Sequence, residues 1–273
     1  MKEKKVTICI PVYNAEKYIQ STLHSLTEQS YSNIQIIVID NCSTDRTCDI
    51  VSACSDPRIK LIKNEKNIGM VGNFNACLHH IDGDYLQIVC ADDYLEKDCI
   101  RLKAEALAHH PDCVIAISAT NIANKDEKVI FTRKSFRKSC IISGKKMLRL
   151  SFAKHNLFGE PTNVMLRANC IEKAGVFSEE LYYAVDWEYW LRMCTLGDVY
   201  YINEPLSRFY LRNDSESSKL IKQYKRILND DRVLVRLCQN NPAMHLDRAQ
   251  IILHKTNVKL RLAKKLLFSL LFN

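Results

Sequence analysis

The first hundred residues alternate short apolar, β-branched runs with segments of helical periodicity. Two such runs, at 6–10 and 34–39, flank a segment whose apolar residues fall on one helical face: Ala15, Tyr18, Ile19, Leu23 and Leu26. The alternation continues, and we expect strands at 59–62 and 85–89 and helices at 45–54, 71–80 and 97–109. This pattern is typical of α/β proteins in which helices connect parallel strands.

After Pro111 the alternation is weaker. We expect a strand at 114–118, a basic hairpin or loop at 124–133, and a short helix at 143–152 capped by Ser143. An apolar stripe predicts a further helix: Tyr183, Trp187, Trp190, Leu191 and Cys194. On that helix Glu188 and Arg192 are spaced i,i+4 for an ion pair.

The last segment, roughly 217–270, is expected to form two helices broken near Asn241-Pro242. It also carries the chain's excess charge. The net charge is +8, but residues 219–273 hold 12 basic and 3 acidic residues, whereas the other 218 residues hold 27 and 28. A body with a charge of −1 and a tail with a charge of +9 do not indicate a nucleic-acid-binding protein.

Composition indicates a globular protein, because 47% of 273 residues are hydrophobic. The twelve cysteines form no CxxC pair, which favours unpaired, mostly buried thiols in a reducing compartment. The start, MKEKK, does not resemble a signal peptide, and no run of about 18 apolar residues predicts a membrane span. We therefore expect a cytoplasmic protein.

Polar residues follow three of the expected strands, where ligands bind in open α/β sheets. Pro11-Val12-Tyr13-Asn14 is either a strand end with a helix cap at Asn14, or a loop that stacks on and bonds a base. Asp40 and Asn41 end a very apolar strand, so the Asp40 carboxylate needs a partner that offsets its desolvation. Asp45 in the same loop is explained by helix capping alone.

Two further sites carry carboxylates with alternative interpretations. Asp92-Asp93 after the strand at 85–89 is either a solvated turn or a site for Mg²⁺ or Mn²⁺ with phosphate oxygens. Asp186 precedes the two tryptophans and is either a first-turn helix acid or a general base whose proton affinity is raised by apolar surroundings.

Taken together, these motifs resemble family-2 glycosyltransferases. The resemblance rests on the opening VTICIPVYNAEKYIQ…IQIIVIDNCSTDRT, followed by NEKNIG, GDYLQIVCADDYL, GEPTNVMLRA and GVFSEELYYAVDWEYWLR, and covers about residues 4–218. It implies an α/β, Rossmann-like nucleotide-diphospho-sugar-binding fold (GT-A) with a mixed central sheet and a C-terminal helical appendage. The catalytic domain would span 1–218, with a nucleotide-binding half to about 110 and an acceptor half after it. Residues 219–273 would be a basic helical extension.

The resemblance also implies roles for individual residues. Pro11 and Tyr13 would line the nucleotide pocket, Asp40 and Asn41 would contact the base or ribose, and Asp92 the ribose. Asp93 would hold Mn²⁺ or Mg²⁺ on the donor diphosphate. Asp186 would be the base that deprotonates the acceptor hydroxyl. The reaction implied is inverting transfer of a sugar, with UDP-sugars favoured, to a glycan or lipid-linked saccharide in polysaccharide or lipopolysaccharide synthesis.

Four positions depart from the family's usual pattern. Asn41 stands where a second acid is frequent, Cys90 where many members have the first Asp of an Asp-x-Asp-Asp run, and Val185 where Glu is frequent. Arg212 stands where His is often found, and could contact the diphosphate as a fixed cation.

Other classes fit less well. A non-catalytic nucleotide- or glycan-binding member of the same fold would not need Asp93 and Asp186. A nucleotidyltransferase would favour a glycine-rich phosphate loop near the amino terminus, and the first glycine is Gly69. A dinucleotide-dependent oxidoreductase would need GxGxxG, which is absent.

The basic and apolar residues of 255–273 allow two interpretations. The helix could dock on the catalytic domain with a solvated basic face, or attach to the anionic inner face of the cytoplasmic membrane, where a lipid-linked acceptor lies.

Overall fold

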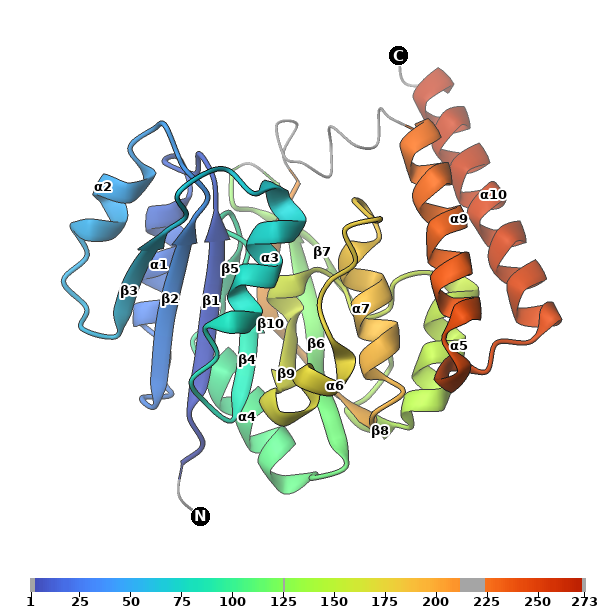
Figure 1. Cartoon of the computed structure of the whole chain (residues 1–273), viewed down its shortest axis with the longest axis horizontal. Coiled ribbons are helices and arrows are strands. Elements are labelled where there is room, and N and C mark those ends of the chain that lie inside the picture. Colours follow the sequence, from blue (N-terminus) through green and yellow to red (C-terminus); the bar gives the residue numbers. More distant parts are fainter. Residues whose placement is uncertain (1–2, 125, 212–223, 272–273) are drawn as a thin grey trace.

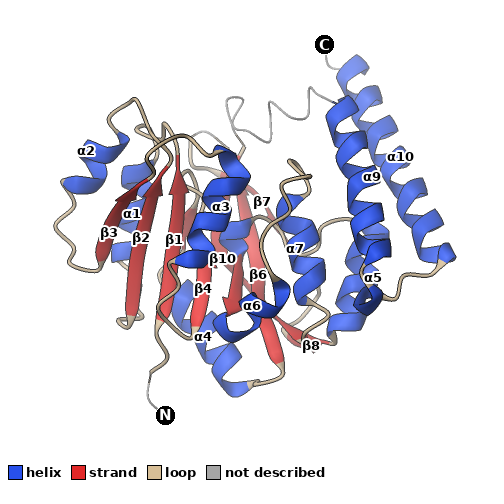
Figure 2. Cartoon of the chain, in the orientation of Figure 1, coloured by secondary structure: helices blue, strands red, loops and turns tan. Residues whose placement is uncertain are grey.

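A computed structural model describes residues 3–124, 126–211 and 224–271. A mixed β-sheet forms its centre, with helices on both faces and a helix pair at one end (Figures 1 and 2). Within the described residues the sheet has ten strands in the order β3-β2-β1-β4-β9-β6-β10-β5, with β7 beside β6 and β8 beside β10. The strands are β1 (Val6–Val12), β2 (Ile34–Asp40), β3 (Ile59–Lys63), β4 (Tyr85–Ile88), β5 (Tyr94–Leu95), β6 (Cys113–Ala123), β7 (Val129–Arg133), β8 (Cys140–Ile142), β9 (Val164–Arg167) and β10 (Asp198–Tyr210).

The amino-terminal half of the sheet is parallel and the rest is mixed. β1 pairs in parallel with β2 and β4, and β2 pairs in parallel with β3. β9 is antiparallel to both β4 and β6, whereas β10 runs parallel to β6. The predicted α/β fold with a mixed central sheet is therefore confirmed, although the antiparallel β9 and the thirteen-residue β10 were not expected from the sequence.

The helices form between the strands largely where periodicity predicts them. They are α1 (Ile19–Thr27), α2 (Thr47–Ser52), α3 (Gly69–His79), α4 (Cys99–His109), α5 (Gly144–Lys154), α6 (Ile171–Ala174), α7 (Val185–Met193), α9 (Tyr224–Asn240) and α10 (Arg248–Leu271), with 3-10 turns η1 (Pro161–Asn163), η2 (Ala168–Cys170) and η3 (Pro242–Met244). The apolar stripe predicted for the helix that carries Trp187 begins too early, because its first residue, Tyr183, precedes α7. Ser143 stands at the start of α5 without a side-chain capping bond, and Asp198 Oδ1 instead accepts from the Gly144 N–H at 3.0 Å.

Strands β1 and β2 are continuously apolar because both of their faces are buried. Ile8 and Ile36 belong to the cluster that α1 and α4 cover, and Cys9 and Ile37 belong to the cluster on the opposite face. The twelve cysteines are free thiols, of which six are buried and six are partly buried, so the expectation of mostly buried thiols holds for only half of them.

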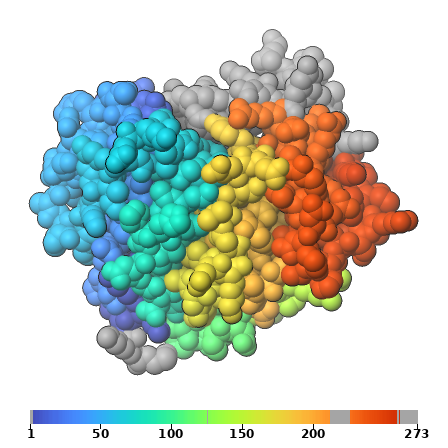
Figure 3. All heavy atoms as spheres, viewed as in Figure 1, coloured from blue at the N-terminus to red at the C-terminus, as the bar shows by residue number. Residues whose placement is uncertain are grey.

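The predicted two-helix tail is confirmed, and it packs against the rest of the chain. Leu234, Val235 and Cys238 of α9 are buried in the same cluster as Trp187 and Trp190 of α7. α10 lies against α5, where the Asn257 amide donates to the Ala153 carbonyl at 2.7 Å. Figure 3 shows the orange α9 beside the yellow segment that precedes α7, with the red α10 on the other side of α9. Among the described helices, none has the length and apolar character needed to cross a bilayer.

Candidate active site

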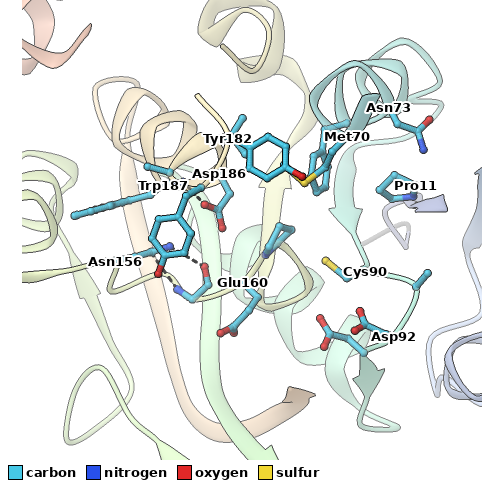
Figure 4. Close-up of a pocket in the computed structure, with 18 of the residues that line it drawn as sticks. Pro11, Met70, Asn73, Cys90, Asp92, Asn156, Glu160, Tyr182, Asp186 and Trp187 are labelled. Carbon is cyan, nitrogen blue, oxygen red and sulfur yellow. Dashed lines mark hydrogen bonds between the residues drawn. The ribbon is translucent and has the colours of Figure 1, made fainter. Parts of the chain in front are cut away.

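A cavity of about 870 Å³ opens beside the carboxyl ends of β1 and β4. Its lining brings together six of the residues singled out in the sequence: Pro11, Tyr13, Asn41, Asp92, Asp93 and Asp186. Figure 4 shows Pro11, Cys90 and Asp92 on one side of the space, and Asp186 and Trp187 on the other. Arg212 lies outside the described residues.

The loop after β1 is held by the loop after β2. Asn14 has a positive φ of 50° and does not cap a helix, since α1 begins only at Ile19. Instead its side-chain oxygen accepts from the Thr44 N–H at 2.8 Å, and its own N–H donates to Ser43 Oγ at 2.9 Å. Tyr13 is left 51% exposed at the cavity. An exposed ring on a braced loop is suited to stacking on a planar ligand.

Asp40 and Asn41 have different surroundings. The buried Asp40 carboxylate accepts from the Ser43 N–H at 3.1 Å, so a partner for this strand-end charge lies in its own loop, and Asp40 is not among the lining residues. Asn41 lines the cavity, and its amide donates to Asn67 Oδ1 at 2.9 Å. The Asn41 oxygen accepts from the Ile68 N–H at 2.9 Å and from Asn64 at 3.1 Å. Contact of either residue with a base or ribose stays a prediction.

The Asp92-Asp93 pair is not an exposed, solvated turn. Asp93 is 4% exposed, and its Oδ2 accepts a hydrogen bond of 2.5 Å from the Thr162 hydroxyl. That hydroxyl oxygen in turn accepts from the Cys90 N–H at 2.9 Å. Burial and the nearby charges of Asp93 and Asp92 raise the pKa of the Cys90 thiol well above its ordinary value, so Cys90 is a neutral group beside the two carboxylates.

Whether this site fits a divalent metal depends on the number of ligands required. The described residues contain no group of three or more His, Cys, Asp or Glu side chains that could hold an ion. Mg²⁺ at phosphate-binding sites, however, commonly takes one or two carboxylates and completes its shell with phosphate oxygens and water. Asp92 and Asp93 line the cavity as two such carboxylates, and the residues therefore fit a metal that binds together with a diphosphate.

Asp186 lies in the first turn of α7 and faces the cavity (Figure 4). Its Oδ1 accepts from the Trp187 N–H at 2.6 Å. Burial raises the pKa of Asp186 to about 7; the Trp187 N–H opposes this rise and the Glu160 charge adds to it. A carboxylate with such a pKa can take a proton from a bound hydroxyl near neutral pH.

An ion pair next to Asp186 was not identified from the sequence. Arg133, at the end of β7, donates to Glu160 Oε1 at 2.6 Å, and both residues line the cavity. Burial alone would lower the pKa of Arg133, but the bond and charge of Glu160 raise it, so the guanidinium stays charged. The signal for Glu160 and Thr162 was present in the motif GEPTNV, whose individual residues had no assigned role.

The C-terminal helices also contribute to the lining, which the sequence did not indicate. Asp230, Asp231 and Leu234 of α9 and Val258 of α10 border the cavity. Asp231 pairs with His254 at 2.7 Å, and the His254 ring stacks on Phe152 with 4.3 Å between ring centroids. Phe152 of α5 is distant in sequence from His254, so no local pattern reveals this contact.

Comparison with known proteins agrees with this geometry. The family model described as "Glycosyl transferase family 2" matches residues 7–173. The chain belongs to this family. An uncharacterized glycosyltransferase of Haemophilus influenzae is 29% identical to the chain over 221 residues, which cover 78% of this chain and 67% of that protein.

Two solved structures share the fold. The poly(ribitol-phosphate) beta-N-acetylglucosaminyltransferase TarS of Staphylococcus aureus is 31% identical over 122 residues, 43% of this chain and 21% of TarS. Its residues 1–349 in complex with UDP-GlcNAc superpose with a TM-score of 0.72 at 19% identity, covering 93% of this chain and 71% of that one. The mannosyltransferase PcManGT from Pyrobaculum calidifontis, in complex with GDP-Man and Mn²⁺, has a TM-score of 0.67 at 17% identity and covers 100% of this chain and 77% of that one. The GT-A fold is thus confirmed.

Proposed function

We propose that this glycosyltransferase moves a sugar from a UDP-sugar to a hydroxyl of a glycan or lipid-linked saccharide, with inversion at the anomeric carbon. The observation that carries the proposal is Asp186, a carboxylate with a pKa of about 7 that faces the cavity from the side opposite Asp92. A donor bound along the strand ends would present its anomeric carbon between the two sides.

The strand-end side of the cavity would bind the nucleotide. Tyr13 would stack on the base, Asn41 and its amide network would contact the base or ribose, and Asp92 would bond the ribose. Asp93 would hold Mn²⁺ or Mg²⁺, which when bound neutralises charge on the departing diphosphate. Arg212 would add a fixed positive charge near the diphosphate. The UDP-GlcNAc in the TarS complex and the Mn²⁺ in the PcManGT complex support this assignment by analogy.

Asp186 would act on the acceptor. As the acceptor oxygen forms its bond to the anomeric carbon, the bond from that carbon to the diphosphate oxygen breaks and the nucleoside diphosphate leaves. The acceptor proton passes to Asp186. Attack on the face opposite the leaving group inverts the configuration, and the sugar carbon carries positive character in the transition state.

A repeating glycan or another polymer precursor is the acceptor class we favour. TarS acts, by its name, on poly(ribitol-phosphate), and it resembles this chain in part of its length. This resemblance supports a role in polysaccharide or lipopolysaccharide synthesis.

A panel of nucleotide-sugars with and without Mn²⁺ tests the function. A ligand that binds only the folded state raises the melting temperature, so the true donor should stabilise the protein, and more so with Mn²⁺. The same donor should be hydrolysed slowly or transferred to an added acceptor, with release of UDP. Binding without any release of UDP would instead favour a non-catalytic nucleotide- or glycan-binding member of the family.

We further propose that the enzyme works at the inner face of the cytoplasmic membrane through residues 255–273. α10 exposes Ile252, Leu253 and Leu260, and the sequence after Val258 adds four basic residues and further leucines. Basic and apolar residues together bind anionic bilayers.

Flotation with anionic liposomes, comparing the full chain with one that ends at Val258, tests this location. The full chain should float, less so at high salt, and the shortened chain should not. Equal, salt-insensitive partitioning of the two would contradict the membrane proposal.

A further inference from the structure

The helix that carries Asp186 begins without a capping side chain of its own. Ala184 precedes α7 as its N-cap and has no side-chain acceptor, and within the first turn the Asp186 Oδ1 accepts only from the Trp187 N–H. The first N–H groups of a helix lack intrahelical acceptors, and alanine is among the poorest residues at the N-cap. The N–H groups of the cap residue and of the residues just before it lie outside the helix, and they need an acceptor from another element.

That acceptor is Asp230 of α9. Its Oδ2 accepts from three consecutive backbone N–H groups: Tyr182 at 2.8 Å, Tyr183 at 2.5 Å and Ala184 at 3.2 Å. Asp230 is 3% exposed and lines the cavity. Hydrogen bonds to an ionised acceptor are stronger than neutral ones, and three donors on one oxygen fix the direction of the backbone.

Other residues tether the same segment. The guanidinium of Arg226, also on α9, lies 3.8 Å from the centre of the Tyr182 ring, and Arg236 pairs with Glu180. At the segment's far end, Asn75 of α3 accepts from the Phe177 N–H at 2.7 Å and donates to the Phe177 carbonyl at 3.1 Å. The segment 177–184 is thus held at one end by the nucleotide-binding half and at the other by the C-terminal extension.

We infer that Asp230 is a positioning residue for sugar transfer, which acts by holding the backbone of 182–184 so that the Asp186 carboxylate points into the cavity. The inference rests on the proposed role of Asp186. It makes the C-terminal extension part of the catalytic unit, because a helix of that extension sets the geometry of the base.

The test compares Asp230→Ala and Asp230→Asn with the control Asp247→Asn. Asp247 is an exposed carboxylate of the same extension that accepts from the Gln250 N–H at 2.8 Å, outside the cavity lining. We expect Asp230→Ala to lower kcat by about 10²-fold, the loss typical of a displacement of about 1 Å at a reacting group. Asp230→Asn, which keeps an oxygen acceptor without the charge, should recover part of that rate, and the control should equal the wild type.

Two further measurements on the same preparations separate positioning from unfolding. Binding of UDP-sugar, measured by calorimetry, should be unchanged in Asp230→Ala, and the amides of 182–184 should exchange hydrogen faster than in the control. A wild-type kcat in Asp230→Ala, or unchanged exchange at these amides, would overturn the inference.

Failure of the proposed function would be recognised separately, as absence of transfer by the wild type with any donor. Amide exchange would then still decide whether Asp230 holds the segment.

Discussion

In the proposed reaction, the chemistry depends most on the environment of one residue, Asp186. An ordinary aspartate would be almost fully ionised at neutral pH and a weak base, whereas burial raises the pKa of Asp186 to about 7. The Glu160 carboxylate raises it further, and Glu160 is itself held by Arg133. The sequence indicated Asp186 by its position before two tryptophans. It did not indicate Glu160, because this neighbouring carboxylate comes from a different part of the chain.

The pKa of Asp186 predicts an acid limb in the pH dependence of transfer. The base is active when deprotonated, so kcat/KM should fall as the pH decreases through about 7. In Glu160→Gln the loss of a neighbouring negative charge should lower the pKa of Asp186 and move this limb to lower pH. The profile of Glu172→Gln, outside the cavity lining, serves as the control. A limb that stays in place in Glu160→Gln would show that Glu160 does not act on the base.

At the scale of the elements, the strand ends were the most predictable part of the site. Apolar runs followed by polar residues identified β1, β2 and β4, and the general rule for open α/β sheets placed their loops together. The bracing of these loops was not predictable, because Thr162, which bonds Asp93, comes from η1, more than sixty residues later. Asp40 illustrates the same limit, since it bonds its own loop and lies outside the cavity lining.

Removal of the Asp93 carboxylate should abolish metal-dependent donor binding. Asp93→Ala loses the carboxylate proposed to hold the metal, so the stabilisation of the protein by UDP-sugar should no longer increase with Mn²⁺. Asp98→Ala, five residues on and outside the cavity lining, is the control. If Mn²⁺ stabilised the donor complex of Asp93→Ala as it does that of the wild type, the metal site would lie elsewhere.

At the scale of the whole molecule, the C-terminal extension and the preceding residues share one core. The sequence located the charge of the extension correctly and predicted its two helices. It could not show that Leu234 of α9 is fully buried beside α7, because packing between segments about fifty residues apart leaves no local periodicity. The boundary at 218 therefore stays a prediction, and the shared core favours unfolding as one unit.

Leu234→Ala tests whether the molecule unfolds as a unit. Truncating a fully buried leucine typically costs about 2–5 kcal/mol, so the melting temperature of the whole protein should fall by roughly 5 °C or more in a single transition. Leu253→Ala, at an exposed position of α10, should change it little. Two separate transitions, with only one of them shifted, would show that the extension is an independent domain.

Substitution of Asp186 should affect stability and activity in opposite directions. Folding raises the pKa of Asp186 from 3.8 to about 7. Between pH 3.8 and about 7 the carboxyl group is therefore protonated in the folded state and ionised in the unfolded state. The free energy of unfolding falls as the pH rises through this range. Asp186→Asn removes this cost, and above pH 7 it should be more stable than the wild type by up to a few kcal/mol. At low pH the side chain at position 186 is neutral in both the wild type and Asp186→Asn, so the two proteins should have similar stability.

The most direct test of Asp186 as the base is therefore the rate of sugar transfer by Asp186→Asn at pH 8. Donor binding and the melting temperature are measured on the same preparation. We predict that donor binding is retained, that the melting temperature is equal to or above that of the wild type, and that sugar transfer is lost by at least about 10²-fold, as expected for a missing general base. Transfer at the wild-type rate by this folded, donor-binding variant would contradict the assignment of Asp186 as the base.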